Sequence, residues 1–275
     1  LQALTPFDFN QILEEVPELR KFAYRIDSWT FDPLIDSSDV EPSLWISLAG
    51  LIEEKYDEYD GFVILHGTDT MAYSASALSF MIENLSKPVI FTGSQLPIGM
   101  PRTDGKENLI SAVEIAAAKD IDGHAIVPEV CICFDNILMR GNRTCKMNSD
   151  NFRAFRSENM APLAEAGINI RYNTPYIIQP PDWNARPVFH MELDTRVSIL
   201  KLHPGITIEL INLSSEQLYN DIRYGRIDLA FINSTVIINE NKYQSFKLID
   251  IEDCFFTTPD FAKKIKNSTL YIVKN

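Results

Sequence analysis

The sequence predicts an α/β protein, in which a larger α/β domain with a parallel sheet is followed by a smaller α/β domain. Short, continuously apolar runs alternate with longer segments of helical period between residues 41 and 134. Strands and helices that alternate at this length are joined by right-handed crossovers, which produce a parallel sheet with helices on both faces. A proline-rich stretch then precedes a β-rich remainder, and we expect domains at residues 1–175 and 196–275 with a linker at 176–195.

The first predicted unit is a helix at residues 41–56 followed by a strand at 62–65. Apolar residues recur at helical spacing from Leu44 to Ile52, and Pro42 stands in the first turn, where a backbone N–H has no intrahelical partner. The run FVIL that follows is typical of a strand covered on both faces.

The same order repeats along the chain. Each later helical segment is rich in small and apolar residues, and each strand is again a short apolar run. We expect helices at residues 71–85 and 107–118 and strands at 88–91, 129–134 and 197–202, the last of which begins the smaller domain.

Composition and charge exclude several classes of function. The 275 residues carry a net charge of −13, concentrated in the first 60 residues. Such a chain lacks the basic surface that binds nucleic acid, so we expect a solvated acidic surface and no nucleic-acid partner. No run approaches the roughly 18 apolar residues of a membrane span, and the first residues do not resemble a signal peptide. We therefore expect no membrane partner and a cytoplasmic location.

Motifs for metals and nucleotides are absent from the sequence. The four cysteines and four histidines show no metal-site spacing, and neither GxGxxG nor GxxxxGK[ST] occurs, so we expect no metal, no cofactor and no nucleotide site. Cys131 and Cys133 stand two residues apart in a predicted strand, so their side chains share one face and do not bridge to each other. Reduced, buried thiols are the expected state.

The loop HGTDT, after the strand at 62–65, is the first candidate site, because ligands of parallel α/β sheets bind at the carboxyl ends of strands. It offers hydroxyls and a carboxylate at the start of a helix, whose free amides favour an anion. Thr68 and Asp69 could orient a hydroxyl or hold a ligand ammonium, but on local sequence alone helix capping is the favoured alternative. For His66 we expect a hydrogen-bonded core histidine rather than a catalytic one.

Two further segments carry candidate residues. Asp36, Ser37 and Ser38 precede a helix, and capping is again the alternative. Lys146 follows the polar turn RGNRTC and is either a solvated amine or, if buried, a lysine that loses its charge near neutral pH and acts as a base toward a hydroxyl. Taken singly, none of these segments is convincing.

Five segments occur together in a fixed order: DSSDV (Asp36–Val40), LHGTDTMAYSASALSFMIENL (Leu65–Leu85), KPVIFTGSQLPIG (Lys87–Gly99), RTDGKENL (Arg102–Leu109) and RGNRTCK (Arg140–Lys146). In this order and spacing they resemble the cytosolic, type I bacterial L-asparaginases. The resemblance extends over about residues 5–206. It implies an asparaginase-like fold of a larger and a smaller α/β domain.

The resemblance also implies an activity and a catalytic set. The family hydrolyses asparagine to aspartate and ammonia as a homo-oligomer, here a homodimer or homotetramer, with active sites at contacts between subunits. By this resemblance Thr68, Asp69 and Lys146 form a catalytic set, in which the lysine helps to activate a threonine and the aspartate organises it. These residue types suit amide hydrolysis, which needs a hydroxyl or water nucleophile, a base and donors for an oxyanion.

A substrate-binding turn is implied in the same way. Asp36, Ser37 and Ser38 match the family's turn that binds the charged groups of the amino acid, together with Thr68 and Asp69.

The sequence departs from the family pattern at three places. The family's first strand, which ends in TGGTI and supplies the threonine expected to attack the carboxamide, is not seen here, and glycine is scarce, at 11 residues. Cys145 stands where the family usually has a second threonine, and residues 213–275 match no family segment. We therefore expect weak or no turnover. The alternative is a non-catalytic module that binds aspartate or asparagine or serves as an oligomerising partner; a tRNA-dependent amidotransferase component is disfavoured by the acidic charge.

Overall fold

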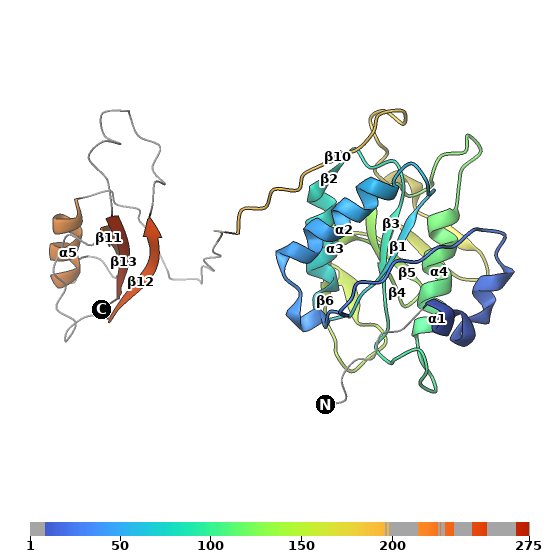
Figure 1. Cartoon of the computed structure of the whole chain (residues 1–275), viewed down its shortest axis with the longest axis horizontal. Helices are drawn as coiled ribbons and strands as arrows, with labels where there is room; N and C mark the ends of the chain where they lie inside the picture. The colour runs from blue at the N-terminus through green and yellow to red at the C-terminus, as the bar shows by residue number, and fades with distance from the viewer. Residues whose placement is uncertain are drawn as a thin grey trace. The chain divides into compact units, whose positions relative to one another are not determined.

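The computed structural model describes residues 9–195, 197, 214–224, 226, 229–233, 244–251 and 268–274. Its contacts divide the chain into two compact units, Leu1–Ser198 and Ile199–Asn275, which we describe one at a time (Figure 1). The domain boundaries expected from the sequence stay a prediction.

A six-stranded sheet with the order β1-β3-β4-β5-β8-β9 forms the centre of the first unit. Strands β1, β3 and β4 are parallel, with Leu65 opposite Thr92 and Phe91 opposite Ile132, which confirms the predicted parallel arrangement for these strands. The sheet then continues with three strands that run antiparallel to their neighbours, an extension that the hydrophobic pattern did not predict. The strands are β1 (Phe62–Leu65), β3 (Val89–Thr92), β4 (Val130–Phe134), β5 (Ile137–Arg140), β8 (Ala164–Ala166) and β9 (Ile170–Tyr172).

The change of direction after β4 has a local cause. Asp135 and Asn136 lie between β4 and β5, and both have positive φ angles, of 50° and 61°. Two consecutive residues with positive φ form the two-residue turn that matches the twist of an antiparallel hairpin. The chain therefore returns at once beside β4 instead of crossing over through a helix.

Helices cover both faces of the sheet, as expected (Figure 1). Val89 and Phe91 pack with α2 and α3 on one face, whereas Ile90 packs with α4 on the other. Cys131 and Cys133 also lie on the α4 side, which confirms that they share one face. The helices are α1 (Phe9–Glu15), α2 (Pro42–Lys55), α3 (Met71–Met81) and α4 (Gly105–Ala117).

The helix predicted for residues 71–85 ends earlier, at Met81, and the prediction is wrong for its last turn. Ile82 pairs in an antiparallel bridge with Phe189, and the backbone N–H of His190 donates to the carbonyl of Met81 at 2.8 Å. A carbonyl at the end of a helix needs a new partner, and here a segment more than 100 residues away in the sequence provides it. The helix predicted for residues 41–56 is confirmed.

Shorter elements complete the first unit. The predicted linker contains a strand, β10, which pairs with β2 of the first unit. The hairpin of β6 and β7 follows β5 and carries Lys146 at the end of β6. These elements are η1 (Pro17–Lys21), η2 (Ser37–Asp39), β2 (Ile82–Glu83), η3 (Gly141–Arg143), β6 (Thr144–Lys146), β7 (Phe155–Ser157), η4 (Thr174–Tyr176) and β10 (Val188–Phe189).

The second unit contains a helix and a three-stranded antiparallel sheet with the order β11-β13-β12. Ser214 and Gln217 form a reciprocal capping box at the start of its helix. Of the strand predicted at 197–202, residues 198–202 lie outside the described residues. The elements are α5 (Ser215–Arg223), β11 (Leu229–Asn233), β12 (Gln244–Ile251) and β13 (Ser268–Lys274).

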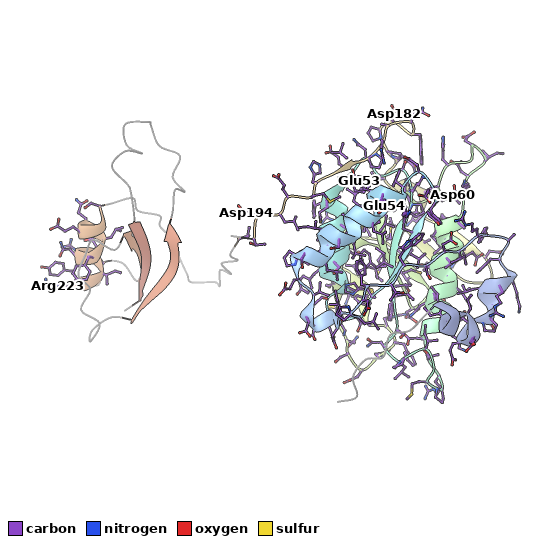
Figure 2. All side chains as sticks on the ribbon, viewed as in Figure 1. Glu53, Glu54, Asp60, Asp182, Asp194 and Arg223 are labelled. Carbon is purple, nitrogen blue, oxygen red and sulfur yellow. The ribbon has the colours of Figure 1, made fainter. Side chains whose placement is uncertain are left out.

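The acidic side chains near the end of α2 lie on the surface. Glu53, Glu54 and Asp60 are all exposed (Figure 2), so the expected solvated acidic surface is confirmed for these three residues. Across the described part of the chain, no helix is both long enough and apolar enough to cross a membrane.

Candidate active site

The loop HGTDT joins the carboxyl end of β1 to the first turn of α3. The backbone N–H of His66 donates to the carbonyl of Thr92 at 2.9 Å, which continues the β1–β3 pairing into the loop. Gly93 follows β3, and a Cβ atom at this position would overlap with the carbonyl oxygen of His66. The absence of a side chain at Gly93 therefore lets the ends of the two strands meet at one edge of the sheet, where sites of parallel α/β sheets are found.

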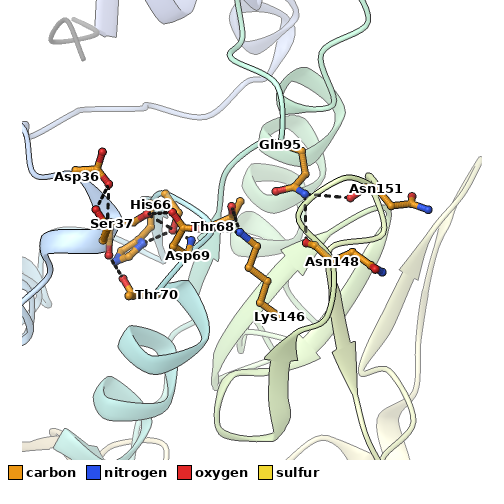
Figure 3. A network of polar contacts seen from close by, with 12 residues as sticks. Asp36, Ser37, His66, Thr68, Asp69, Thr70, Gln95, Lys146, Asn148 and Asn151 are labelled. Carbon is orange, nitrogen blue, oxygen red and sulfur yellow. Dashed lines mark hydrogen bonds and ion pairs between the residues drawn. The ribbon is translucent and has the colours of Figure 1, made fainter. Parts of the chain in front are cut away.

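Three of the predicted site residues meet at this edge. The Nζ atom of Lys146 lies 2.8 Å from Oγ1 of Thr68 and 2.7 Å from Oδ1 of Asp69 (Figure 3). The side chain of Lys146 is 18% exposed, whereas that of Asp69 is 61% exposed. The amine is thus largely enclosed beside a hydroxyl, while the carboxylate stays accessible to a ligand. Such an amine is placed to exchange a proton with the threonine.

Ser37 belongs to the same network. Its hydroxyl lies 3.4 Å from both Oδ2 and the backbone nitrogen of Asp69, which are long contacts. A shorter bond comes from Thr70, whose hydroxyl donates to the carbonyl of Ser37 at 2.5 Å. The turn that contains Ser37 is therefore fixed to the HGTDT loop from 32 residues away in the sequence.

Asp36 and Ser38 bond mainly to each other. One carboxylate oxygen of Asp36 accepts from the backbone N–H and from the hydroxyl of Ser38, both at 2.9 Å. These bonds lower the pKa of the Asp36 carboxyl, with the backbone bond as the larger cause. Asp36 is the N-cap of η2, a short element before α2, whereas the N-cap of α2 itself is Glu41. Asp36 lies next to Ser37, at the rim of the network (Figure 3).

Capping does not explain the HGTDT loop. The N-cap residue of α3 is Thr70, which makes no side-chain capping bond, and the side chains of Thr68 and Asp69 contact Lys146 instead. The capping interpretation of these two residues is therefore wrong. The reason is that Lys146, from β6, supplies a partner that the local sequence does not contain.

His66 is hydrogen-bonded, as expected, but it is half-buried rather than part of the core. Its Nδ1 atom lies 2.7 Å from the carbonyl oxygen of Gly67, and its Nε2 atom lies 2.9 Å from the hydroxyl of Ser74. Burial is the larger effect on the ring and lowers its pKa, against a smaller opposing effect of the bond to Gly67. The lowered pKa favours the neutral ring.

The structure adds supporting residues that the sequence analysis did not single out. The carboxylate of Asp104 accepts from the backbone N–H groups of Gln95 and Leu96 at 3.0 to 3.1 Å, which shapes the loop after β3. The side chain of Gln95 donates to the carbonyls of Asn148 and Asn151 at 3.4 and 3.1 Å (Figure 3). The loop after β3 is thereby tied to the loop that follows Lys146.

Asn108 was detectable in the sequence as a polar residue on the apolar side of a predicted helix. It is only 2% exposed and donates to the carbonyl of Gly93 at 2.9 Å and to Asp104 at 3.1 Å. Its side-chain oxygen, Oδ1, accepts from the backbone N–H of Asp135 at 3.0 Å. Asn108 therefore joins the chain segments that follow β3 and β4.

Among the described residues, no group of three or more His, Cys, Asp or Glu side chains is arranged to hold a metal ion.

Comparisons with known proteins match the chain to one family. Residues 1–177 match the family model "Asparaginase, N-terminal". The chain is 48% identical to L-asparaginase 1 of Escherichia coli (strain K12) over 182 residues, which cover 66% of this chain and 51% of the relative.

Solved structures show the same relationship. The crystal structure of L-asparaginase I from Vibrio cholerae superposes with a TM-score of 0.64 at 42% identity and covers 77% of this chain and 61% of that chain. The thermostable L-asparaginase from Thermococcus kodakarensis gives a TM-score of 0.61 at 35% identity, and the match covers 78% of this chain and 60% of that chain. The chain spans about half the length of the E. coli relative that it matches.

Proposed function

Because the chain belongs to the asparaginase family, we propose that it is an asparaginase-type amidohydrolase, which converts L-asparagine to L-aspartate and ammonia. The family model covers the part of the chain that contains the entire Thr68, Asp69 and Lys146 network. The named relatives support the reaction type, and the network supports the assignment of roles.

The observation that carries the proposal is the position of Lys146. Its amine lies within hydrogen-bond distance of the Thr68 hydroxyl and the Asp69 carboxylate at once. In the proposed step Thr68 takes the nucleophile role that the resemblance gives to the threonine of the TGGTI strand. Lys146 acts as the base and takes the proton of Thr68 while the Thr68 oxygen bonds to the carboxamide carbon of asparagine. The proton then passes to the departing nitrogen, ammonia leaves, and water hydrolyses the resulting ester to aspartate. No metal and no cofactor enters this scheme.

We propose that the substrate's charged groups are held by Asp69 and by the turn of Asp36, Ser37 and Ser38. The exposed carboxylate of Asp69 suits an ammonium group, and Ser37 lies against it. The hydroxyl and backbone N–H of Ser38, which here donate to Asp36, are donors of the kind that suits a substrate carboxylate. The resemblance to type I enzymes supports a cytoplasmic homodimer or homotetramer as the complete assembly.

Ammonia release from asparagine by the purified chain tests this proposal. Lys146→Ala removes the proposed base, and we expect turnover to fall by about 100-fold or more. Lys119→Ala is the matched control, because Lys119 forms a surface ion pair with Asp60, and its turnover should stay at the level of the unmodified chain. If the unmodified chain and Lys146→Ala release ammonia at the same rate, catalysis by this chain is excluded.

The second candidate is a non-catalytic module that binds asparagine or aspartate. It is favoured by the carboxylate of Asp69, which is 61% exposed and therefore accessible to a ligand ammonium whether or not a nucleophile acts. Calorimetric titration with aspartate distinguishes the two functions. Stoichiometric binding that Asp69→Asn abolishes, without any ammonia release, would support the binding module over the enzyme.

A further inference from the structure

Behind the HGTDT loop, three side chains from different elements form one chain of hydrogen bonds. The indole Nε1 of Trp45, on α2, donates to the hydroxyl of Ser74, on α3, at 2.9 Å. The Ser74 hydroxyl lies 2.9 Å from Nε2 of His66, and Nδ1 of the same ring lies 2.7 Å from the carbonyl of Gly67. Ser74 is fully buried, so this hydroxyl must find its partners within the protein.

The direction of every bond in this chain follows from its two ends. The indole N–H of Trp45 can only donate, and the carbonyl oxygen of Gly67 can only accept. The bond to Gly67 therefore places a proton on Nδ1 of His66. In a neutral ring Nε2 is then an acceptor, and the single hydroxyl proton of Ser74 points to it. One tautomer of His66 satisfies all three bonds.

The carbonyl at the end of the chain belongs to the peptide bond that leads into Thr68. Because a peptide group is planar, a bond that orients the Gly67 carbonyl also orients the backbone nitrogen of Thr68. This nitrogen is bonded to the Cα atom of Thr68, which carries the side chain. The Thr68 hydroxyl lies 2.8 Å from the Lys146 amine. A rotation of this peptide would move the hydroxyl away from the amine.

We propose that Trp45 and Ser74 are positioning residues that act through His66 to orient the Gly67–Thr68 peptide and thereby hold the Thr68 hydroxyl against Lys146. Neither residue touches the Thr68 or Lys146 side chain in the bonds described above, so the effect is transmitted through the imidazole. Two features keep the ring in place. The ring makes an edge contact with Phe91, at 5.7 Å between ring centres, and its burial disfavours the protonated, charged imidazole. The consequence for turnover rests on the proposed function, whereas the tautomer and the Thr68–Lys146 distance do not.

The tautomer is measured first, by nitrogen NMR of the chain labelled in its four histidines, with the His66 signals assigned from the spectrum of His66→Gln. We expect His66 in the Nδ1–H form in the unmodified chain. Ser74→Ala removes the donor to Nε2, so the Nε2 signal of His66 should shift while Nδ1 stays protonated. Ser79→Ala is the control on the same helix, because the Ser79 hydroxyl bonds to the carbonyl of Ser76 and not to His66, and it should leave the spectrum unchanged. An Nε2–H form in the unmodified chain, or an unchanged His66 signal in Ser74→Ala, overturns the proposal.

The position of Thr68 is measured next, by crystal structures of His66→Asn and His66→Gln. The side-chain amide of asparagine can replace the Nδ1 donor, whereas that of glutamine replaces Nε2. We expect the distance between Lys146 Nζ and Thr68 Oγ1 to stay near 2.8 Å in His66→Asn and to exceed hydrogen-bond range in His66→Gln. The same distance in both variants would overturn the proposal.

Turnover gives the third measurement. With a misplaced Thr68, kcat should fall about tenfold or more in Ser74→Ala and His66→Gln, with KM within about threefold, and His66→Asn should recover part of the loss. A loss that is equal in His66→Asn and His66→Gln, or that appears only in KM, contradicts the positioning role. If the unmodified chain shows no turnover, the proposed function fails, and the tautomer and distance measurements still decide the positioning role.

Discussion

A Cβ atom added to Gly67 would lie 2.5 Å from Oγ and 2.6 Å from Cβ of Ser37. The HGTDT loop and the turn of Ser37 are thus in contact at a position where only glycine fits. The two segments are distant in the sequence, yet the fit between them places Ser37 beside the Asp69 carboxylate.

Gly67→Ala should therefore disturb the site more than the rest of the fold. The new methyl group must displace Ser37, which separates its hydroxyl from Asp69, and we expect a loss of about 1 to 3 kcal/mol in the free energy of unfolding. Aspartate binding, measured by calorimetry, should weaken as well. Gly50→Ala is the matched control, because no atom lies within 4 Å of the place that its new methyl group would occupy on α2, and it should raise stability by up to about 1 kcal/mol. Similar urea midpoints for the two variants would contradict this expectation.

Removal of one partner from the largely buried ion pair of Glu129 and Arg140 should strongly destabilise the first unit. Two bonds join the pair, at 2.5 and 3.0 Å, and the side chains are only 8% and 14% exposed. The same groups bond to the backbone of Tyr176 and Ile178 at 2.7 Å each, which holds this segment on the sheet. Arg140→Met leaves a buried carboxylate without its cation, and we expect a loss of about 3 to 5 kcal/mol in urea unfolding.

The control for this pair is an exposed ion pair on the same sheet. Arg171 and Glu165 lie 3.1 Å apart, with side chains that are 81% and 55% exposed. Arg171→Met should cost less than about 1 kcal/mol, since exposed pairs contribute little. Equal losses for Arg140→Met and Arg171→Met would show that burial of the first pair has no energetic effect.

His66 should make the stability of the fold depend on pH. Burial lowers the pKa of the folded ring below its ordinary value of 6.5. As the pH falls below 6.5, the unfolded chain takes up a proton at His66 that the folded chain does not, so the free energy of unfolding decreases. This contribution is complete above pH 6.5 and is lost as the pH falls toward the folded pKa. Urea unfolding at pH 7.5, 6.5 and 5.5 should therefore show a steeper loss for the unmodified chain than for His66→Gln, and parallel curves would exclude the effect.

The two thiols on β4 should be inert in the native protein. Cys131 and Cys133 are buried, and burial raises the pKa of Cys133 to about 12 and that of Cys131 well above its ordinary value. The reactive thiolate is therefore scarce near neutral pH. In a Cys145→Ser/Cys254→Ser variant, Ellman's reagent at pH 8 should detect almost no thiol until denaturant is added, and then two per chain. Rapid reaction without denaturant would refute the burial of both side chains.

Much of the first unit could be predicted from local pattern. The helix at 41–56 and the parallel strands β1, β3 and β4 follow from the spacing of apolar residues. A helix on the surface of a sheet must bury one apolar stripe, and a strand covered on both sides must bury both faces, so each leaves its own pattern in the local sequence. The antiparallel extension could not be predicted in this way, since it depends on two positive φ angles in a short turn. The end of α3 at Met81 depends on a bond from His190, which local pattern does not contain.

The sequence by itself determined the α/β class, the family resemblance and the identity of Thr68, Asp69 and Lys146 as candidates. Only the tertiary structure decided that these residues meet, because a bond between positions 68 and 146 depends on how β1 and β6 are placed in space. It also excluded capping of α3 by Thr68 and Asp69, since their side chains contact an amine that comes from another element. The bonds from Trp45 through Ser74 to His66 join three elements in the same way. The periodicity of apolar residues indicates which face each segment must bury, whereas the partners of polar groups come from segments that are distant in the chain.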